Sequence, residues 1–555
     1  MNDKRIPLGI EFYETVATDC YYVDKTNIIE NITNFPIGTC LLFTRPRRFG
    51  KSLMLSMLQS FYELNDIDKS KYFIDKYIWN NKEIVNNNFQ KYPLIHINLK
   101  NVIGLNFSSL IDKVKDCMKE EYQRHAEILS MNVLDKYDVK YFNSIISKEI
   151  SSSDLSSSLY RLSKFLYDTY QKQVIILIDE YDTPVHYAYD YNFYDEAIMF
   201  FKQFFGESLK GNPCIHLAIL TGILQIAKES LFSGLNNLVV NSILTKNMAE
   251  GFGFNEKEVK DLLKYYNFND RYEDVVKYYG GYKFGNTLIC NPLSLLSFIQ
   301  HGGELDTYWT NTGESSTLTK LLAPQNISYL LPLLKGDSIQ SDIDIAISYK
   351  DIDESMLSVS TYLLASGYLT IKQVYDDYYE LIFPNLEIKE VFEREVRSRY
   401  LKKEQIPLVL SLKKAFKEGN TTSLEELIRK YLLSSFTYYE MNNEKNYQVL
   451  LVTTLSIIFD SAYVKNEYNA RTCRADIIVI PKDNKDLGFI IETKNIKTRT
   501  TKARLDESSS IALKQIITKG YDQDLIRLGI KNIILFGIAF YKNKVSISTK
   551  KLVNN

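Results

Sequence analysis

The sequence is poor in the residues that bind structural metals or form disulfides. Its 555 residues include six cysteines, five histidines and two tryptophans. The cysteines are scattered without a Cys-x-x-Cys pair, at positions 20, 40, 117, 214, 290 and 473. This spacing argues against a zinc site and a disulfide framework, and it fits a reducing compartment.

The chain also lacks an excess of either charge and a long apolar run. Lysine and arginine number 67, aspartate and glutamate 68, and the formal net charge is -1. A global basic field is therefore excluded, and any nucleic-acid contact must come from a local patch. No stretch of about 18 uncharged apolar residues occurs, so we predict no membrane partner and a cytoplasmic protein, or a nuclear or host-cell location if it is an effector.

The composition that remains is that of a large globular protein. Hydrophobic residues make up 45% and charged residues 24% of the chain. A chain of this length is expected to form about two to four domains. The strongest signals for chemistry lie in two places, one in the N-terminal half and one near the C-terminus.

Near the N-terminus, an apolar strand runs into a basic loop and a helix. We predict the strand at Cys40–Thr44 and the helix at Leu53–Tyr62, with the loop between them ending in Gly50-Lys51-Ser52. In a phosphate-binding loop, backbone amides hold the phosphates, the lysine reaches the β- and γ-phosphate oxygens, and the hydroxyl ligates magnesium. By spacing alone the match is partial, because Arg45 stands where the pattern has its first glycine. A Gly-Lys-Ser tripeptide also occurs as a plain helix cap.

A continuous apolar run, Val174–Ile178, ends in Asp179 and Glu180. Such a run is typical of a central parallel strand, and acidic residues at its carboxyl end lie where open α/β sheets bind ligands. We expect Asp179 to hold magnesium through water and Glu180 to polarise the water that attacks ATP. Thr221, after a third strand at Ile215–Leu220, is a candidate γ-phosphate sensor, with a helix cap as the alternative. The alternation of strands and helices predicts a parallel sheet flanked by helices.

Five segments of the chain suggest a known family when they are taken together. They are Tyr22-Val23-Asp24-Lys25-Thr26, Arg45-Pro46-Arg47-Arg48-Phe49-Gly50-Lys51-Ser52, Ile178-Asp179-Glu180-Tyr181-Asp182, Leu220-Thr221-Gly222 and Phe232-Ser233-Gly234-Leu235-Asn236-Asn237-Leu238. With them, most of the chain resembles AAA-ATPase-like proteins that end in a PD-(D/E)XK nuclease-superfamily domain. The resemblance implies that Arg45 is a family variant of the loop. Our hypothesis is that Arg45, Arg47 and Arg48 are extra phosphate ligands that replace the missing glycine.

The resemblance and the pattern of elements divide the chain into four parts. We expect a P-loop ATPase core at residues 1–254, a helical lid at 255–335, a helical and winged-helix-like connector at 336–433 and a restriction-endonuclease-like α/β domain at 434–555. The connector combines a helix with two short β runs across an aspartate-rich turn. Because Asp376 and Asp377 in that turn would repel DNA phosphates, we favour a packing role over DNA reading.

The last part carries the second set of chemical signals. Its expected order of helix, three strands, helix and strand is the core of restriction-endonuclease-like folds. Asp476 begins one strand, and Glu492-Thr493-Lys494 ends the next. Asp476 and Glu492 would ligate magnesium or manganese, and Lys494 would orient or activate the attacking water. Taken alone, an aspartate followed by Glu-x-Lys is a degenerate pattern.

The resemblance also concerns the surroundings of these carboxylates. It implies that Gln515, in the following helix, borders the site. The chain departs from the family at Cys473, where glycine is common, and at Tyr447-Gln448, where Tyr-His is frequent. A basic stretch follows the strand, formed by Lys494, Lys497, Arg499, Lys502 and Arg504. It favours steering of a nucleic-acid backbone, with an ordinary solvated loop as the alternative.

The sequence thus predicts a P-loop protein that binds and hydrolyses ATP and is coupled to a magnesium-dependent nuclease acting on DNA or RNA. The alternative is a nucleotide-gated nucleic-acid-binding or regulatory protein whose nuclease-like domain does not cut. A metabolic kinase is a third hypothesis, disfavoured because Glu180 suits water better than a substrate hydroxyl. The choice between DNA and RNA and the formation of a homo-oligomer are left open.

Overall fold

The structure is a computed structural model in which the chain forms two compact units. The first unit comprises Met1–Gly313 and Gln340–Glu390, and the second Glu314–Ile339 and Val391–Asn555. The described residues are 4–226, 231–232, 235–309, 321–322, 324–334, 336–353, 355–376, 378–400, 406–435, 444–459, 462–470, 473–481, 483 and 486–553. Among their helices, none has the length and apolar character that a membrane crossing requires.

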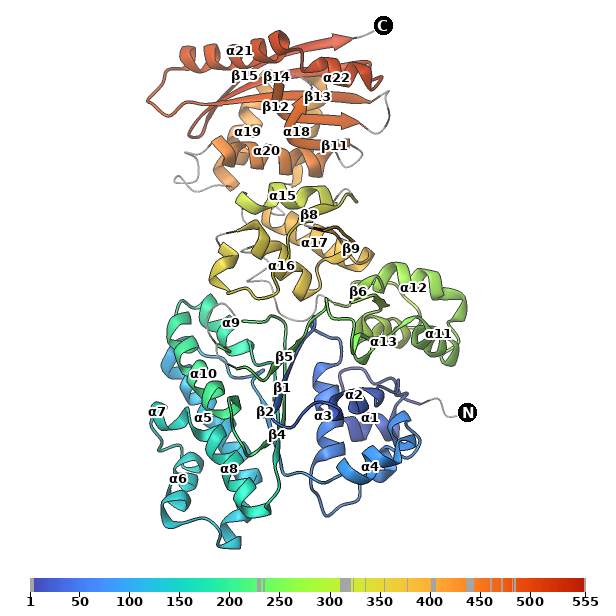
Figure 1. Cartoon of the computed structure of the whole chain (residues 1–555). Helices are drawn as coiled ribbons and strands as arrows, with labels where there is room; N and C mark the ends of the chain where they lie inside the picture. The colour runs from blue at the N-terminus through green and yellow to red at the C-terminus, as the bar shows by residue number, and fades with distance from the viewer. Residues whose placement is uncertain are drawn as a thin grey trace. The chain divides into compact units, whose positions relative to one another are not determined.

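The centre of the first unit is a five-stranded parallel sheet with the order β2-β3-β4-β1-β5 (Figure 1). Its strands are β1 (Thr39–Thr44), β2 (Leu94–Asn98), β3 (Val174–Asp179), β4 (Ile215–Gly222) and β5 (Leu238–Asn241). All residues of β1 and β3 are buried, as expected for central parallel strands covered on both faces. The predicted α/β class with a parallel sheet is confirmed, whereas β5 was not predicted.

Helices cover both faces of this sheet (Figure 1). One side carries α1 (Tyr13–Asp19), α2 (Asn27–Thr33), α3 (Lys51–Tyr62) and α4 (Lys82–Asn88). The other carries α5 (Phe107–Arg124), α6 (Lys136–Ile146), α7 (Ser152–Leu155), α8 (Ser158–Tyr170), α9 (Thr183–Asp190) and α10 (Tyr194–Leu209). Helix α3 starts directly after the basic loop, so its N-terminus points at the carboxyl end of the sheet.

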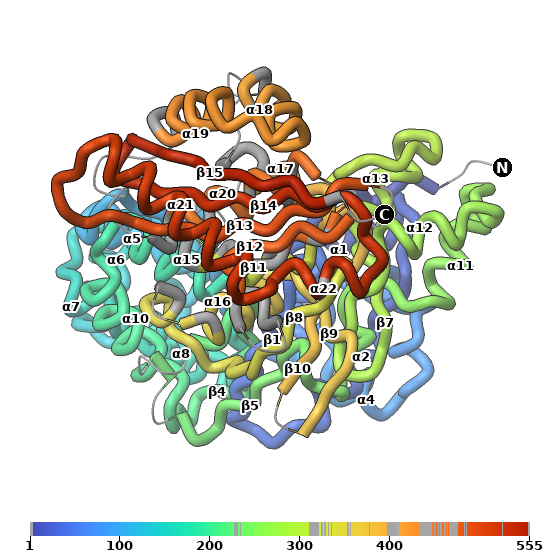
Figure 2. The backbone as a smooth tube through the Cα atoms, turned by 90° about the horizontal axis from the view of Figure 1, so that it is seen from above, coloured from blue at the N-terminus to red at the C-terminus, as the bar shows by residue number. Residues whose placement is uncertain are grey.

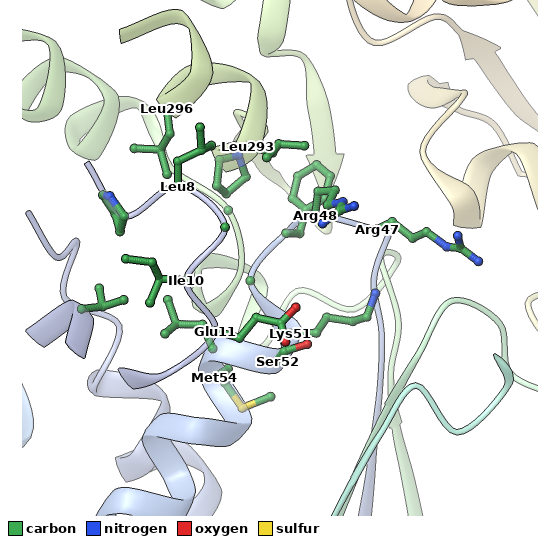
Figure 3. A pocket seen from close by; sticks show the side chains of 18 of the residues that line it. Leu8, Ile10, Glu11, Arg47, Arg48, Lys51, Ser52, Met54, Leu293 and Leu296 are labelled. Carbon is green, nitrogen blue, oxygen red and sulfur yellow. The ribbon is translucent and has the colours of Figure 1, made fainter. Parts of the chain in front are cut away.

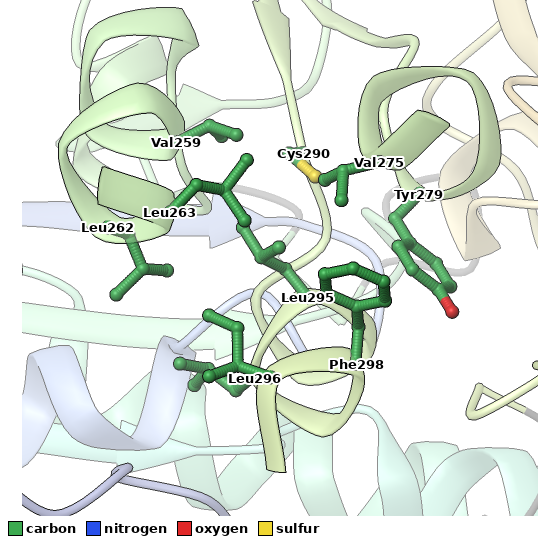
Figure 4. Packing of buried hydrophobic residues seen from close by; sticks show 10 residues of the cluster. Val259, Leu262, Leu263, Val275, Tyr279, Cys290, Leu295, Leu296 and Phe298 are labelled. Carbon is green, nitrogen blue, oxygen red and sulfur yellow. The ribbon is translucent and has the colours of Figure 1, made fainter. Parts of the chain in front are cut away.

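The region predicted as a lid follows as a small helical bundle with a hairpin. Its elements are α11 (Glu256–Tyr265), α12 (Tyr272–Tyr279), β6 (Tyr282–Phe284), β7 (Thr287–Ile289) and α13 (Pro292–Gln300). Figure 4 shows its apolar core, in which Leu262, Leu263, Leu295 and Phe298 are fully buried. Leu8 and Tyr21, from the segment that precedes α2, pack against this core. The N-terminal segment thus joins this bundle to the part of the first unit that holds the parallel sheet.

The connector contains the expected helix and hairpin. Helix α16 (Met356–Ser366) is followed by β9 (Thr370–Val374) and β10 (Tyr379–Ile382), and with β8 (Ile339–Ser341) the strands form a sheet of order β8-β10-β9. Asp376 is exposed in the turn, and Asp377 lies outside the described residues. Helix α17 (Leu386–Tyr400) begins in the first unit, which ends at Glu390.

The second unit divides the chain differently from the predicted domains. It includes α15 (Pro324–Leu334), which the sequence places within the predicted lid. Helices α18 (Ile406–Glu418) and α19 (Thr421–Ser435), predicted as part of the connector, also belong to it. The grouping into two units thus differs from the predicted division into four parts.

A mixed five-stranded sheet is the centre of the second unit, and Figure 2 shows its strands side by side in the order β11-β12-β13-β14-β15. The elements are α20 (Glu444–Ile458), β11 (Ala462–Ala470), β12 (Cys473–Pro481), β13 (Leu487–Asn495), α21 (Lys502–Lys519), α22 (Asp522–Arg527), β14 (Asn532–Tyr541) and β15 (Lys544–Val553). Strands β13 and β14 are parallel and the other pairs antiparallel. This arrangement confirms the predicted fold of the C-terminal domain and adds β15.

Neighbouring residues of β13 face opposite layers of helices, as the alternation of a strand requires. The ring of Phe489 contacts Phe416 of α18 and Phe459, which directly follows α20, with centroids 6.3 and 4.9 Å away. Ile490 belongs to the cluster that packs against α21 and α22. On β14, a Cβ added to Gly537 would lie 2.2 Å from the Ser509 carbonyl oxygen, so glycine permits close packing of α21.

Candidate functional site

The basic loop between β1 and α3 places Lys51 at the carboxyl end of the sheet. Lys51 Nζ donates to the carbonyl oxygens of Arg45 (3.2 Å) and Pro46 (3.3 Å). It also lies 3.4 Å from Glu180 Oε1. Gly50 has φ 86°, which a residue with a side chain rarely adopts, and this turn directs the first amides of α3 toward the loop. The arrangement fits a loop that encloses phosphate oxygens.

Ser52 and Asp179, which are far apart in the sequence, are in direct contact. Ser52 Oγ donates to Asp179 Oδ2 at 2.6 Å. Asn98 Nδ2 donates to the same oxygen at 3.3 Å, and Thr221 Oγ1 donates to Oδ1. Burial raises the pKa of Asp179, and the nearby charge of Glu180 adds to the effect. A hydroxyl and a carboxylate placed together are ligands that suit magnesium.

Thr221 lies behind Asp179 and is fully buried. Its hydroxyl donates to Asp179 and accepts from Glu180 N at 3.3 Å, and its carbonyl oxygen accepts from Tyr181 N at 2.9 Å. Thr221 therefore positions the Asp179 carboxylate and the backbone of Glu180, and its contact with a γ-phosphate stays a prediction.

Asp182, for which the sequence suggested no role, ties the ends of β3 and β4 together. Its Oδ2 accepts hydrogen bonds from Ile223 N (2.8 Å) and Leu224 N (3.0 Å). Burial raises the pKa of Asp182 to about 6, with a further contribution from Glu180. The only sequence signal for Asp182 was its place two residues after the acidic pair Asp179-Glu180.

A cavity of about 510 Å³ opens beside the loop (Figure 3). Its polar lining includes Arg47, Arg48, Gly50, Lys51, Ser52 and Glu180. Its apolar lining includes Pro7, Leu8, Ile10, Leu262, Leu293 and Leu296, from the N-terminal segment and the lid. A volume of this size is typical of small-molecule sites. Charged groups at one end and aliphatic groups at the other match the phosphates and the base of a nucleotide.

Arg45 does not take part in this lining, and its position disagrees with the prediction that it contacts phosphate. Its side chain is fully buried, and its guanidinium donates to the carbonyl oxygens of Thr44 (2.9 Å) and Asn241 (2.7 Å) and to Asn241 Oδ1 (2.6 Å). The guanidinium also lies over the rings of Phe252 and Phe284. Arg45 thus joins β1 to β5 and the lid.

In the second unit, Asp476 and Glu492 lie on neighbouring strands. The register of β12 and β13 pairs Ile477 with Ile491, which places the two carboxylates opposite one another. Asp476 Oδ2 accepts hydrogen bonds from Thr493 N and Thr493 Oγ1, both at 2.7 Å. These two bonds fix the orientation of the Asp476 carboxylate.

Glu492 contacts the other two predicted residues of this site, Lys494 and Gln515. Its Oε1 lies 3.2 Å from Lys494 Nζ and accepts a hydrogen bond from Gln515 Nε2. Its Oε2 is buried without a hydrogen-bond partner. Burial raises the pKa of Glu492 to about 7, and the charge of Asp476 contributes. An unpaired buried oxygen beside a second carboxylate fits a divalent cation, which would satisfy it and offset the repulsion.

Gln448 is a neighbour of this site that sequence analysis noted only as a departure from the family. Its side chain, on α20, is buried, and Nε2 donates to Thr493 Oγ1 at 3.0 Å. Since Thr493 Oγ1 donates in turn to Asp476, Gln448 is linked to the carboxylate through one hydroxyl. The only sequence feature that could have indicated this role is the position of Gln448 in the helix that precedes the three strands.

The basic stretch after β13 is partly neutralised. Lys502 Nζ lies 2.9 Å from Glu425 Oε2 and 3.1 Å from Asp506 Oδ1. Lys497, Arg499 and Arg504 are exposed. The described residues contain no group of three or more histidine, cysteine or acidic side chains that could hold a metal, so the predicted nuclease metal site depends on two carboxylates.

Comparison with known proteins gives both domains a class. Residues 7–232 match the family described as a predicted AAA-ATPase, and residues 442–550 match the PD-(D/E)XK nuclease superfamily. The chain therefore carries an AAA-ATPase-like domain followed by a C-terminal nuclease-superfamily domain. It is also 25% identical over 409 residues to a protein of Azotobacter chroococcum mcd 1 described as an uncharacterized protein in the vnfD 5' region. That alignment covers 72% of this chain and 71% of the relative.

Proposed function

We propose that the protein hydrolyses ATP in its N-terminal domain and, under the control of that site, cuts DNA or RNA with magnesium in its C-terminal domain. The observation that carries the proposal is the convergence of Asp476, Glu492, Lys494 and Gln515 at one end of the second sheet. Two carboxylates beside an ammonium are the groups that phosphodiester hydrolysis requires.

In the ATPase site, each residue has one task. Lys51 and the first amides of α3 hold the β- and γ-phosphates. Ser52 and Asp179 supply oxygen ligands for magnesium, Asp179 through water. Glu180 accepts the proton of the attacking water, a task that its position beside Lys51 supports. The aliphatic side chains of Leu8, Leu293 and Leu296 contact the base.

In the nuclease site, Asp476 and Glu492 hold the metal, and Lys494 orients the attacking water against the phosphate. Bound magnesium supplies charge neutralisation and lowers the pKa of that water. Gln515 fixes the Glu492 carboxylate, and Thr493 fixes that of Asp476. Manganese, which prefers the same oxygen ligands, is expected to replace magnesium.

The test is incubation of the purified chain with single- and double-stranded DNA and RNA, with magnesium or manganese, with and without ATP. We expect cleavage of at least one substrate, its loss in EDTA, and a change in its rate when ATP is added. Lys494→Ala should abolish cleavage and leave ATP turnover intact. Lys514→Ala, which removes an exposed lysine next to Gln515, should behave as wild type.

The alternative function makes a different prediction in the same assay. A nucleotide-gated binding or regulatory protein would retain nucleic acid in the presence of ATP without cutting it in either metal. The contacts of Glu492 with Lys494 and Gln515 favour the active nuclease. Cleavage that survives in Lys494→Ala would remove Glu492 and Lys494 from the mechanism.

A further inference from the structure

The segment Tyr22-Val23-Asp24-Lys25-Thr26 supports the family resemblance but has no part in the chemistry above. Its end is anchored in the ATPase core. Asp24 Oδ1 accepts hydrogen bonds from Thr26 N (2.9 Å) and Thr26 Oγ1 (2.7 Å), and Asp24 Oδ2 accepts one from Tyr77 N (2.7 Å). Thr26 is fully buried, and its Oγ1 accepts a hydrogen bond from Ile78 N at 3.1 Å. This part of the segment is therefore fixed to the core.

The side chain of Lys25 reaches from this anchor to the lid. Its Nζ lies 2.6 Å from both carboxylate oxygens of Glu258, in the first turn of α11, and donates to the Glu250 carbonyl oxygen at 2.7 Å. The side chains of Lys25 and Glu258 are 13% and 19% exposed. An ion pair so far withdrawn from water leaves a costly unpaired charge when one partner is removed.

Glu258 is itself held rigidly at the start of the lid helix. Its Oε2 accepts a hydrogen bond from Asn255 N at 2.8 Å, while Asn255 Oδ1 accepts one from Glu258 N at 3.0 Å. This reciprocal pair is a capping box, which fixes the first turn of α11. The contact of Lys25 with Glu258 therefore holds the N-terminal end of α11 in place.

The same segment borders the nucleotide cavity. Tyr22 and Lys25 line it together with Leu262 of α11. Tyr22 Oη accepts a hydrogen bond from Lys25 N at 3.2 Å and lies 3.3 Å from Met57 Sδ of α3. The ring of Tyr21 packs on Tyr265 of α11, with centroids 4.5 Å apart. The segment therefore lies between the helix of the phosphate loop and the lid.

We propose that the Lys25–Glu258 ion pair is a latch that holds the lid over the base-binding end of the nucleotide cavity. Lys25 is then a positioning residue that determines how long ATP or ADP remains bound. The inference rests on the proposed ATP site and adds to it a residue that controls release. Opening of a lid limits product release in many enzymes, so a tie of this kind acts on dissociation and not on the chemical step.

Two substitutions remove the ion pair in different ways. Lys25→Met keeps the apolar stem and deletes the charge. Glu258→Gln deletes the opposite charge and keeps an oxygen acceptor for Asn255 N. In the full chain, stopped-flow release of N-methylanthraniloyl-ADP should be roughly tenfold faster in each variant, because loss of one partner of a buried pair acts mainly on dissociation. The double variant should release no faster than either single variant, because both substitutions remove the same ion pair.

A matched control is available on the same helix. Lys260 forms an ion pair with Glu256 at 2.6 Å, but both side chains are more than half exposed. Lys260→Met should release nucleotide at the wild-type rate, because a solvated pair on the outer face of α11 contributes little. Release as fast as in Lys25→Met would overturn the latch, since any lost charge on α11 would then suffice.

Inorganic tripolyphosphate separates a latch from a phosphate contact. It has no base for the lid to cover, so wild type and Lys25→Met should bind it equally. Weaker binding in Lys25→Met would overturn the proposal by making Lys25 a phosphate ligand. Release of the fluorescent ADP at the wild-type rate in both latch variants would also overturn it.

Lys51→Ala distinguishes failure of the proposed ATP site from failure of the proposed latch. Unchanged ADP affinity there refutes the ATP site, whereas lost affinity with unaltered latch variants refutes the latch alone.

Discussion

Lys51 Nζ lies 3.4 Å from Glu180 Oε1, so the loop lysine and the carboxylate after β3 form one charged pair in the AAA-ATPase-like domain. Glu180 has φ 53°, a left-handed conformation that costs energy for a residue with a side chain. The hydrogen bonds from Glu180 N to Thr221 Oγ1 and from Thr183 N to Glu180 O hold this turn at 3.3 and 3.1 Å. The fold thus fixes the carboxylate beside the lysine.

Replacing Glu180 by glutamine should slow ATP hydrolysis by about 100-fold or more, because a glutamine cannot accept the proton of the attacking water. ATP affinity should change little, since Lys51 and Ser52 remain. Single-turnover hydrolysis and nucleotide titration measure the two effects separately. Glu196→Gln, an exposed change in α10, serves as the control. Unchanged turnover in Glu180→Gln would exclude Glu180 from the mechanism.

Arg45 and Arg48 should respond differently to alanine. Arg45→Ala leaves the carbonyl and amide oxygens of Asn241 without their buried donor, and we expect a loss of about 2 to 3 kcal/mol in unfolding free energy. Arg48→Ala, at the cavity, should lower ATP affinity and leave the thermal midpoint near that of wild type. Differential scanning fluorimetry and nucleotide titration of both variants test this. A stable Arg45→Ala would contradict its structural role.

Gln448 should act on metal binding through Thr493. If the proposed site holds magnesium, Gln448→Ala should weaken metal affinity by roughly tenfold, as loss of groups that orient metal ligands does. Isothermal titration with manganese measures this without reference to cleavage. Gln448→His, which keeps a ring N–H donor, should restore part of the affinity, and the exposed Gln523→Ala should have no effect. Equal affinity in Gln448→Ala would show that Thr493 orients Asp476 unaided.

The strands could be predicted where the pattern of apolar residues is unambiguous. Val174–Asp179 is apolar up to its last residue, and β3 follows it residue for residue. The sequence does not indicate the edge strand β15, because Lys544–Val553 breaks its apolar alternation with Ser-Thr-Lys-Lys at 548–551, a composition that also suits an exposed tail. All ten residues of β15 pair with β14, and a turn of two residues connects the two strands. The formation of an edge strand such as β15 thus depends more on pairing with a neighbouring strand than on its own pattern of apolar residues.

The sites were predictable in part for a similar reason. The order of the strands brings Ser52 to Asp179 and Asp476 to Glu492, because parallel strands end at the same edge and adjacent strands share a register. The direction of a long side chain is not fixed in this way. Arg45 turns inward because Asn241, which is 196 residues away in the sequence, offers it two oxygens. No sequence pattern near Arg45 indicates that Asn241 is its partner.

Glu387 should make the stability of the first unit depend on pH. It is fully buried at the start of α17, where it accepts hydrogen bonds from Ser294 Oγ (2.8 Å) and Trp309 N (2.9 Å). Burial raises the pKa of Glu387 to about 7. A carboxyl whose pKa rises on folding stabilises the folded state fully below its unfolded pKa of about 4.3, and this contribution is lost as the pH rises through 7.

Glu387→Gln removes this titration and keeps both hydrogen-bond partners within reach. Its unfolding free energy at pH 8 should exceed that of wild type by up to about 3 kcal/mol, and the difference should shrink toward pH 5 because the wild-type carboxyl is then protonated. Urea unfolding at pH 5, 6.5 and 8 measures it. Glu390→Gln, an exposed change one turn further along α17, is the matched control. If the unfolding free energies of Glu387→Gln and wild type depend on pH in the same way, Glu387 ionises freely in the folded protein. That result would contradict the proposed effect of its burial beside Ser294 and Trp309.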